Sequence, residues 1–141
     1  MKTGIIAGNF DVIHPGYIHM FEQCKEHCDS LVVLLHEDPS VERPEKMKPI
    51  LPVIDRMRML KALSNVDGVM VYKLEKDLHD IISTGFRMNV FHVRFLGDDY
   101  VGKSFTGDDL DIPIQYLNRD HGWSTTKYKK LIAESISAQY N

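Results

Sequence analysis

Short apolar runs alternate with amphipathic stretches along nearly the whole chain, and this alternation limits the folds open to it. Residues 5–7 and 31–35 are continuous apolar runs, as expected of strands that are covered on both faces. The pattern predicts further strands at 69–72, 90–96 and 112–117, and helices at 15–28, 54–63, 77–84 and 124–137. We therefore expect an α/β fold: a Rossmann-like, doubly wound, mostly parallel five-stranded sheet with helices on both faces.

Length and composition narrow the class of protein further. The 141 residues suit a single domain, 1–141, and their formal charge of −3 disfavours a general nucleic-acid partner. The longest apolar run, 31–35, is far shorter than the roughly 20 residues that cross a bilayer, so we expect no membrane partner. Two cysteines form no disulfide framework, and the first apolar stretch is too short for a secretory signal. These features predict a cytoplasmic protein.

The expected topology indicates where a ligand would bind. In doubly wound sheets, ligands bind beyond the carboxyl ends of the strands, at the switch point beside the first strand. Three segments follow strands at that edge: 8–17, 97–103 and 118–126. The chemistry of the protein is expected in these segments.

The first segment, 8–17, joins the first predicted strand to the first predicted helix. Gly16 leaves the backbone open near the helix start, where the helix dipole favours an anion. The His14 imidazole could donate a hydrogen bond to a phosphate oxygen there. The alternative is an ordinary strand–helix connection, in which Asp11 caps the helix and His14 is solvated.

The third segment places three consecutive hydroxyls, on Ser124, Thr125 and Thr126, at the start of the last predicted helix. Together with the unpaired amides of that helix and the guanidinium of Arg119, they would form a phosphate cradle. The alternative is a plain helix cap, which needs only the hydroxyl of Ser124.

Two of these segments resemble family motifs. Segment 8–17 reads G-N-F-D-V-I-H-P-G-Y and resembles the G-x-F-D-x-x-H-x-G-H signature of the cytidylyltransferase-like nucleotidyltransferases. Segment 119–126 reads R-D-H-G-W-S-T-T and resembles their R-x-x-G-x-S-T-T motif, which is typical of the cytidylyl branch. The likeness runs nearly end to end, and the chain most resembles the small glycerol-3-phosphate cytidylyltransferases.

The resemblance implies a cytidylyltransferase that transfers CMP from CTP to a phosphorylated small metabolite, by default glycerol 3-phosphate, and releases pyrophosphate. It implies Mg²⁺ carried mainly by the triphosphate, with no metal-ligating residues assigned, and a homodimer. The residues that it assigns to catalysis are His14, Lys46 and Arg119; to nucleotide binding, Gly8, Asn9, Phe10, Asp11, His14, Gly16, Tyr17, Gly97, Asp98, Arg119, Gly122, Trp123, Ser124, Thr125 and Thr126; and to the phosphorylated acceptor, Lys46, Lys48 and Arg56.

One position departs from the signature, because Tyr17 stands where the family has its second histidine. A phenol donates one hydrogen bond but does not become cationic near neutral pH. Tyr17 therefore leaves open a catalytically weakened nucleotide-binding protein. An adenylyltransferase on the same scaffold is a second alternative, because the family resemblance implies that enzymes using ATP share the histidine signature. No nucleophile–base pair is evident, and attack by a phosphate dianion on the nucleotide would need none.

Other patterns in the chain have simpler interpretations. Residues 97–104 fit the P-loop pattern G-x-x-x-x-G-K-[ST], but the residues that follow do not favour the helix a P-loop requires, so Asp98 is expected in a turn facing the nucleotide. Cys24 and Cys28 are expected to be buried core thiols. Trp123 could either stack on the nucleotide or pack the last helix.

Overall fold

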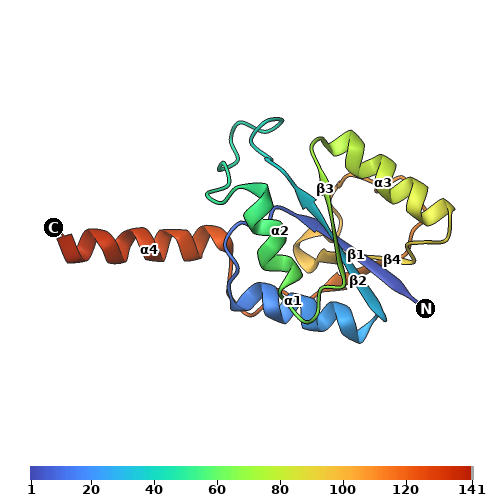
Figure 1. Cartoon of the computed structure of the whole chain (residues 1–141), viewed down its shortest axis with the longest axis horizontal. Coiled ribbons are helices and arrows are strands. Elements are labelled where there is room, and N and C mark those ends of the chain that lie inside the picture. The colour runs from blue at the N-terminus through green and yellow to red at the C-terminus, as the bar shows by residue number, and fades with distance from the viewer. Residues whose placement is uncertain (141) are drawn as a thin grey trace.

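Five parallel strands form one sheet in the computed structural model, which describes residues 1–140 (Figure 1). The strands are β1 (Thr3–Gly8), β2 (Ser30–His36), β3 (Gly68–Tyr72), β4 (Val93–Gly97) and β5 (Ile114–Leu117), in the order β3-β2-β1-β4-β5. The chain moves outward from β1 to β3 and then crosses back to β4, so the switch point lies between β1 and β4. The predicted doubly wound sheet is confirmed, and every strand pair in it is parallel.

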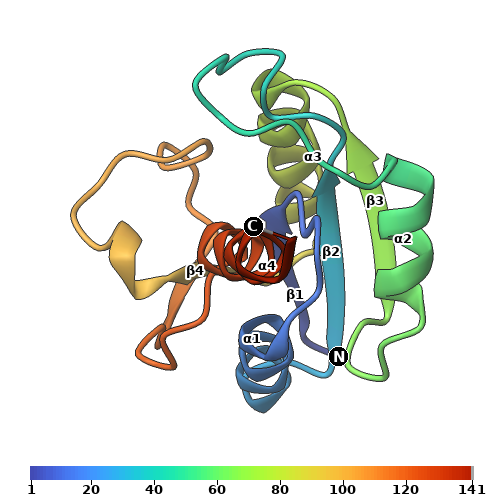
Figure 2. The same ribbon diagram turned by 90° about the vertical axis from the view of Figure 1, so that its left-hand side faces the viewer.

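Helices cover both faces of this sheet, as predicted. They are α1 (Pro15–Glu26), α2 (Val53–Lys61), α3 (Glu75–Arg87) and α4 (Thr125–Tyr140), with a short 3₁₀ turn η1 (Asp98–Tyr100) after β4. Buried residues of α1 and α2 join the core cluster on one face, and those of α3 join the cluster on the other. Figure 2 shows α1 and α3 on opposite sides of the strands.

The continuous apolar runs are explained by this double coverage. Ile5 and Ile6 are neighbours in β1, yet Ile5 belongs to the core cluster that contains Ile82 of α3, while Ile6 belongs to the cluster that contains Phe21 of α1. Successive side chains of a strand point to opposite faces, so both must be apolar when both faces are covered.

Two predicted strands are shorter than expected. The strand predicted at 90–96 begins at Val93, because the amides of Val90 and Phe91 donate to Gly85 at the end of α3 instead. The strand predicted at 112–117 begins at Ile114, directly after Pro113, which has no amide to donate to a ladder.

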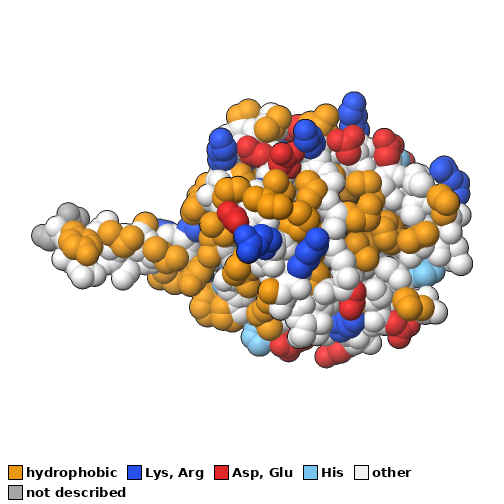
Figure 3. All heavy atoms as spheres, viewed as in Figure 1, with side chains coloured by type: hydrophobic (Ala, Val, Ile, Leu, Met, Phe, Trp, Pro, Cys, Tyr) orange, Lys and Arg blue, Asp and Glu red, His pale blue; other side chains and the backbone are white. Residues whose placement is uncertain are grey.

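The last helix is set apart from the rest of the molecule. Its start lies against the body, but most of α4 projects outward (Figure 1), and none of its residues is buried. The space-filling view shows apolar side chains along the projecting part (Figure 3). Within residues 1–140, no helix combines the length and apolar character needed to cross a membrane.

Candidate nucleotide-binding site

The two motif segments, 8–17 and 119–126, meet at the switch-point edge of the sheet through residues as far apart in the chain as Tyr17 and Thr125, 108 positions. The hydroxyls of Tyr17 and Thr125 are hydrogen-bonded to each other, and Thr125 Oγ1 lies 3.3 Å from His14 Nε2. The rings of His14 and Trp123 stack with centroids 5.9 Å apart. We call this contact region, formed by His14, Gly16, Tyr17, Trp123 and Thr125, the nucleotide cradle.

His14 is fixed in position and in tautomer by its own backbone. It caps α1, its side chain is only 5% exposed, and its Nδ1 accepts a hydrogen bond from the Gly16 amide at 3.1 Å. The proton therefore sits on Nε2, which faces Thr125. Burial, with the charges of His121 and Arg119, lowers the pKa of His14. The imidazole is thus a neutral hydrogen-bond donor, and the alternative of a solvated His14 is wrong.

Gly16 allows the two segments to approach each other. A Cβ atom at this position would lie 2.6 Å from Trp123 Cβ and 2.8 Å from Cε1 of both His14 and His121. These separations are too short for any side chain, so only glycine fits between the segments. The two helix N-termini, with their partial positive charge, consequently lie close together.

The start of α4 is capped as the hydroxyl run predicted. Ser124 Oγ accepts from the Lys127 amide at 3.1 Å, and its carbonyl accepts from Tyr128. Gly122 precedes the cap with a φ of +79°, a conformation that favours glycine. Because Ser124 supplies the cap, the hydroxyls of Thr125 and Thr126 are not needed for it, and that of Thr126 is on an exposed residue.

Arg119 crosses the end of β4 above Gly97. A Cβ at Gly97 would lie 2.5 Å from Arg119 Cδ, and the guanidinium pairs with Asp99 at 3.5 Å. Asp98 and Asp99 lie in the 3₁₀ turn, which leads into further turns and not into a helix. The rejection of a P-loop at 97–104 is confirmed.

The loop after β1 is held in an unusual conformation. Phe10 has a φ of +42° and is 3% exposed, with its ring packed 5.2 Å from that of Tyr17. Gly8 makes room for this ring, because a Cβ there would lie 3.1 Å from it. Left-handed backbone at a bulky residue is uncommon and persists only where its surroundings hold it.

Asp11 connects this loop to two distant segments. The carboxylate is 1% exposed and accepts from the amides of Ile50 at 2.8 Å and Leu51 at 2.9 Å, and from Lys129 Nζ of α4. The alternative in which Asp11 caps α1 is wrong, because His14 fills that position. Lys129 was missed in the sequence, although it lies four residues after Thr125 and hence on the same side of the helix.

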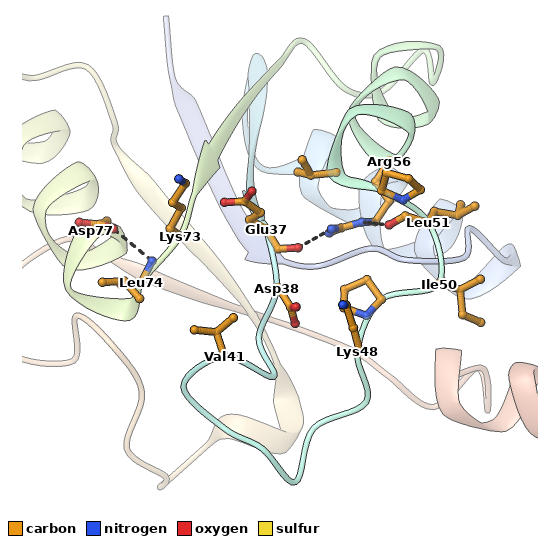
Figure 4. A pocket seen from close by; sticks show the side chains of 13 residues that line it. Glu37, Asp38, Val41, Lys48, Ile50, Leu51, Arg56, Lys73, Leu74 and Asp77 are labelled. Carbon is orange, nitrogen blue, oxygen red and sulfur yellow. Dashed lines mark hydrogen bonds between the residues drawn. The ribbon is translucent and has the colours of Figure 1, made fainter.

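A cavity of about 760 Å³ opens beyond the ends of β2 and β3 (Figure 4). We call it the β2–β3 cavity. Its walls come from the proline-rich loop, the start of α2 and the β3–α3 connection: Glu37, Asp38, Val41, Lys48, Pro49, Ile50, Leu51, Pro52, Val53, Arg56, Lys73, Leu74 and Asp77. Two of the residues predicted to bind the acceptor, Lys48 and Arg56, line it. Lys46 is exposed on the same loop and does not.

Arg56 links the wall of the cavity to the loop after β1 by hydrogen bonds. It is 2% exposed, and its nitrogens donate to the carbonyls of Leu51 at 2.9 Å, Asn9 at 3.0 Å, His36 at 2.7 Å and Glu37. Figure 4 shows the side chain reaching Glu37 and Leu51. The structure thus gives Arg56 a bracing role, and its contact with an acceptor stays a prediction.

The acidic side of the cavity was also missed in the sequence. Asp38 accepts from the hydroxyl of Ser40 at 2.6 Å and from its amide at 2.9 Å, and the hydroxyl bond leads the causes that lower the pKa of Asp38. Glu37 and Asp77 add carboxylates, while Lys48 adds positive charge opposite Asp38 (Figure 4). The rule that ligands bind at the carboxyl ends of parallel strands could have identified Glu37 and Asp38, since both follow β2.

The cysteines belong to the core, as predicted. Cys24 is 0% and Cys28 8% exposed, both thiols are free, and burial raises the pKa of Cys24 well above its ordinary value. Among the 140 described residues, no three His, Cys, Asp or Glu side chains gather as a metal-binding group.

The switch-point edge of this parallel sheet thus carries the N-termini of two helices and a buried neutral histidine, an arrangement that suits a phosphate-bearing ligand. The model of the cytidylyltransferase-like family matches residues 5–131, and the chain belongs to this family. The predicted cytidylyltransferase-like family is confirmed.

The relatives of the chain differ in length and in name. It is 39% identical over 111 residues to the bifunctional protein HldE of Hyphomonas neptunium, matching 78% of this chain and 22% of HldE. It is 34% identical over 120 residues to the FAD synthase of Thermococcus sibiricus, matching 79% and 80% of the two chains. The chain therefore spans about a fifth of the HldE relative. Neither relative is named as a glycerol-3-phosphate cytidylyltransferase.

A solved structure supports the fold. The lipopolysaccharide core biosynthesis protein of Thermoplasma volcanium superposes with a TM-score of 0.62 at 23% identity, over 85% of this chain and 97% of that one.

Proposed function

We propose that the chain transfers a nucleotidyl group from a nucleoside triphosphate, first of all CTP, to the phosphate of a small acceptor. The observation that carries the proposal is the meeting of His14 and Thr125, which brings the N-termini of α1 and α4 together. Two helix N-termini and a neutral N–H donor suit a polyanion such as a triphosphate.

The reaction needs alignment and charge stabilisation. An oxygen of the acceptor phosphate attacks the α-phosphorus and forms a new P–O bond, while the bond to the bridging oxygen breaks and pyrophosphate leaves with its electron pair. The acceptor phosphate is largely a dianion at neutral pH, since its second pKa is about 6. His14 Nε2 would donate to a phosphate oxygen as charge develops, with Arg119 as a cationic partner.

The β2–β3 cavity is proposed as the acceptor site. Hydrogen bonds of Asp11 and Arg56 connect it to the loop after β1, which leads into the nucleotide cradle. Asp11 accepts from the amides of two cavity residues, Ile50 and Leu51, and Arg56 of the cavity wall donates to the carbonyls of Leu51 and Asn9. Lys48 lies in the cavity, and Lys46 is close in sequence on a loop that could bring it near. Glycerol 3-phosphate is the first acceptor to test. It has about ten non-hydrogen atoms, whereas cavities of this volume hold drug-sized ligands. Larger phosphorylated acceptors therefore fit the cavity too.

The nucleotide has a second candidate. The R-x-x-G-x-S-T-T motif at 119–126 supports CTP. The FAD synthase relative, which matches most of the length of both chains, supports ATP, because FAD contains an adenylate group.

Mg²⁺ is proposed to arrive with the triphosphate, held mainly by its oxygens and by water. Asp98 and Asp99 place two further carboxylates in the turn after β4, and that of Asp99 already pairs with Arg119. When bound, the ion would neutralise phosphate charge.

Pyrophosphate release tests these proposals. CTP and ATP are supplied separately, each with glycerol 3-phosphate, with a sugar phosphate and without acceptor. We expect acceptor-dependent release with one nucleotide. Release with ATP alone would replace the cytidylyl assignment by the adenylyl one. Protection by a nucleotide in a thermal melt, without release from any mixture, would favour a binding protein that has lost activity.

A homodimer formed through α4 is also proposed. Its residues 131–140 carry one charge, Glu134, while Leu131, Ile132 and Ile136 are about half exposed. An isolated amphipathic helix is marginal in water, and a second copy of the helix offers the same low-charge apolar face. Sedimentation should show a dimer that Leu131→Glu with Ile136→Glu dissociates and that Ser137→Glu leaves intact; a wild-type monomer would contradict the proposal.

A further inference from the structure

His121 carries a buried donor that has no acceptor. Its Nδ1 accepts a hydrogen bond from the Trp123 amide at 3.0 Å, so the proton of the neutral ring sits on Nε2. That Nε2 is buried and has no hydrogen-bond partner within residues 1–140. Buried polar atoms are nearly always paired, so an unpaired one calls for an explanation.

The geometry of His121 repeats that of His14. In both residues Nδ1 accepts from the amide two positions along the chain, and in both Cε1 lies 2.8 Å from the point where a Gly16 Cβ would be. Burial is also the leading cause that lowers the pKa of each ring, followed by neighbouring histidine and arginine charges. Two neutral imidazoles, from opposite ends of the chain, therefore flank the first turn of α1.

The Tyr17 hydroxyl, also in the first turn of α1, is already hydrogen-bonded to Thr125. His121, in contrast, lines a hollow of about 230 Å³ together with Trp123, Lys127 and Tyr128. Lys127 makes this hollow suitable for an anion, and the hollow borders the His121 side chain.

We propose that His121 is a second phosphate-binding imidazole, whose Nε2–H donates to an oxygen of the nucleotide's triphosphate beside His14. The proposal rests on the proposed nucleotidyltransferase function. It includes a small rotation of the ring toward the ligand, because Nε2 is covered by protein in the structure.

Two substitutions separate this role from a purely structural one. His121→Asn keeps an oxygen that can accept from the Trp123 amide but removes the distal donor. His121→Gln places an amide N–H near the position of Nε2 but loses the hydrogen bond that Nδ1 accepts from the Trp123 amide. His27→Asn, at the exposed far end of α1, is the matched control.

Binding is followed by fluorescence of Trp123, the only tryptophan, with CTP, ATP and inorganic tripolyphosphate as ligands, and turnover by pyrophosphate release. We expect His121→Asn to weaken binding of the triphosphates about tenfold or more, and His121→Gln to restore part of it. Thermal melts should show His121→Asn folded like the wild type.

The outcomes distinguish this proposal from the one it rests on. Wild-type affinity and turnover in His121→Asn would overturn the role of His121 and leave the proposed function standing. Nucleotide binding by the wild type without turnover would overturn the proposed function, while the affinity of His121→Asn would still decide the role of His121. A wild type that binds none of the three ligands would overturn both.

Discussion

Lys129 of α4 donates to Asp11 in the loop after β1, which joins the last helix to the first motif across 118 residues of sequence. Burial alone would raise the pKa of Asp11, but the amides of Ile50 and Leu51 and the charge of Lys129 outweigh it and hold that pKa below its ordinary value. Because no residue of α4 is buried, this ion pair is a principal anchor of the helix to the body.

Replacing Lys129 by Met should destabilise the protein, because it removes the ammonium group and keeps most of the apolar stem. The Asp11 carboxylate would keep its two amide partners but lose its counter-charge inside the protein, which we expect to cost about 1–3 kcal/mol. Urea unfolding measures the loss. Lys130→Met, at the exposed neighbouring position, should leave the free energy of unfolding within about 0.5 kcal/mol of wild type. Equal losses in the two variants would show that the Lys129–Asp11 ion pair does not anchor the helix.

Gly16→Ala should separate the two halves of the nucleotide cradle. The new methyl group would collide with Trp123 and with both imidazoles, so segment 119–126 must move outward. We expect at least tenfold weaker nucleotide binding and a loss of about 1–3 kcal/mol in stability. Gly68→Ala is the control, because a Cβ there meets only Val32 at 3.7 Å. Wild-type affinity in Gly16→Ala would show that the cradle tolerates a wider separation.

The main features of the fold could be predicted from the sequence because they depend on local pattern. The run 31–35 is apolar throughout since both faces of β2 are covered, and Pro15 and Ser124 mark helix starts by local backbone chemistry. The strand predicted to begin at residue 90 was too long, because the end of α3 takes the amides of Val90 and Phe91, a competition that residue types do not reveal.

The site could be predicted only where motif and topology coincide. His14 follows β1 and Thr125 follows β5, the two strands on either side of β4, so the parallel sheet brings both residues to the same edge. The partners of Asp11 and Arg56 could not be foreseen, since they depend on how the proline-rich loop returns to the body. The sequence likewise does not distinguish Lys46 from Lys48, since both are lysines of the same loop. The path of that loop in the structure leaves Lys46 exposed and places Lys48 in the wall of the cavity.

Tyr17 and Thr125 should be energetically coupled. Tyr17→Phe and Thr125→Val each remove one hydroxyl of the pair, and each should cost about 1 kcal/mol of unfolding free energy. Because either change alone breaks the same bond, the double variant should lose less than the sum of the single losses, by roughly 0.5 kcal/mol or more. Strictly additive losses in a double-mutant cycle would mean that the two hydroxyls act independently.

His14→Ala should lower turnover by about a hundredfold or more, because one donor to the developing phosphate charge is lost. The substitution also removes the cap of α1, so stability must be measured in parallel. His14→Asn keeps an acceptor for the Gly16 amide and should restore stability without restoring turnover. Recovery of the rate in His14→Asn would assign the effect to capping and not to catalysis, and His27→Ala serves as the unaffected control.

Acidification should destabilise the protein in a range set by two histidines. The folded pKa of both His14 and His121 lies below the ordinary value of 6.5, so below that pH the unfolded chain binds more protons than the folded one. Stability is therefore full above about pH 6.5 and falls as the pH drops toward the folded pKa values. Asp11 and Asp67, whose pKa values are lowered from 3.8, lose their contribution only at lower pH. Urea unfolding at about pH 7.5 and about pH 5 should show this decrease, and the double variant His14→Asn with His121→Asn should show a smaller one. An equal decrease in the variant would assign the acid sensitivity to other groups.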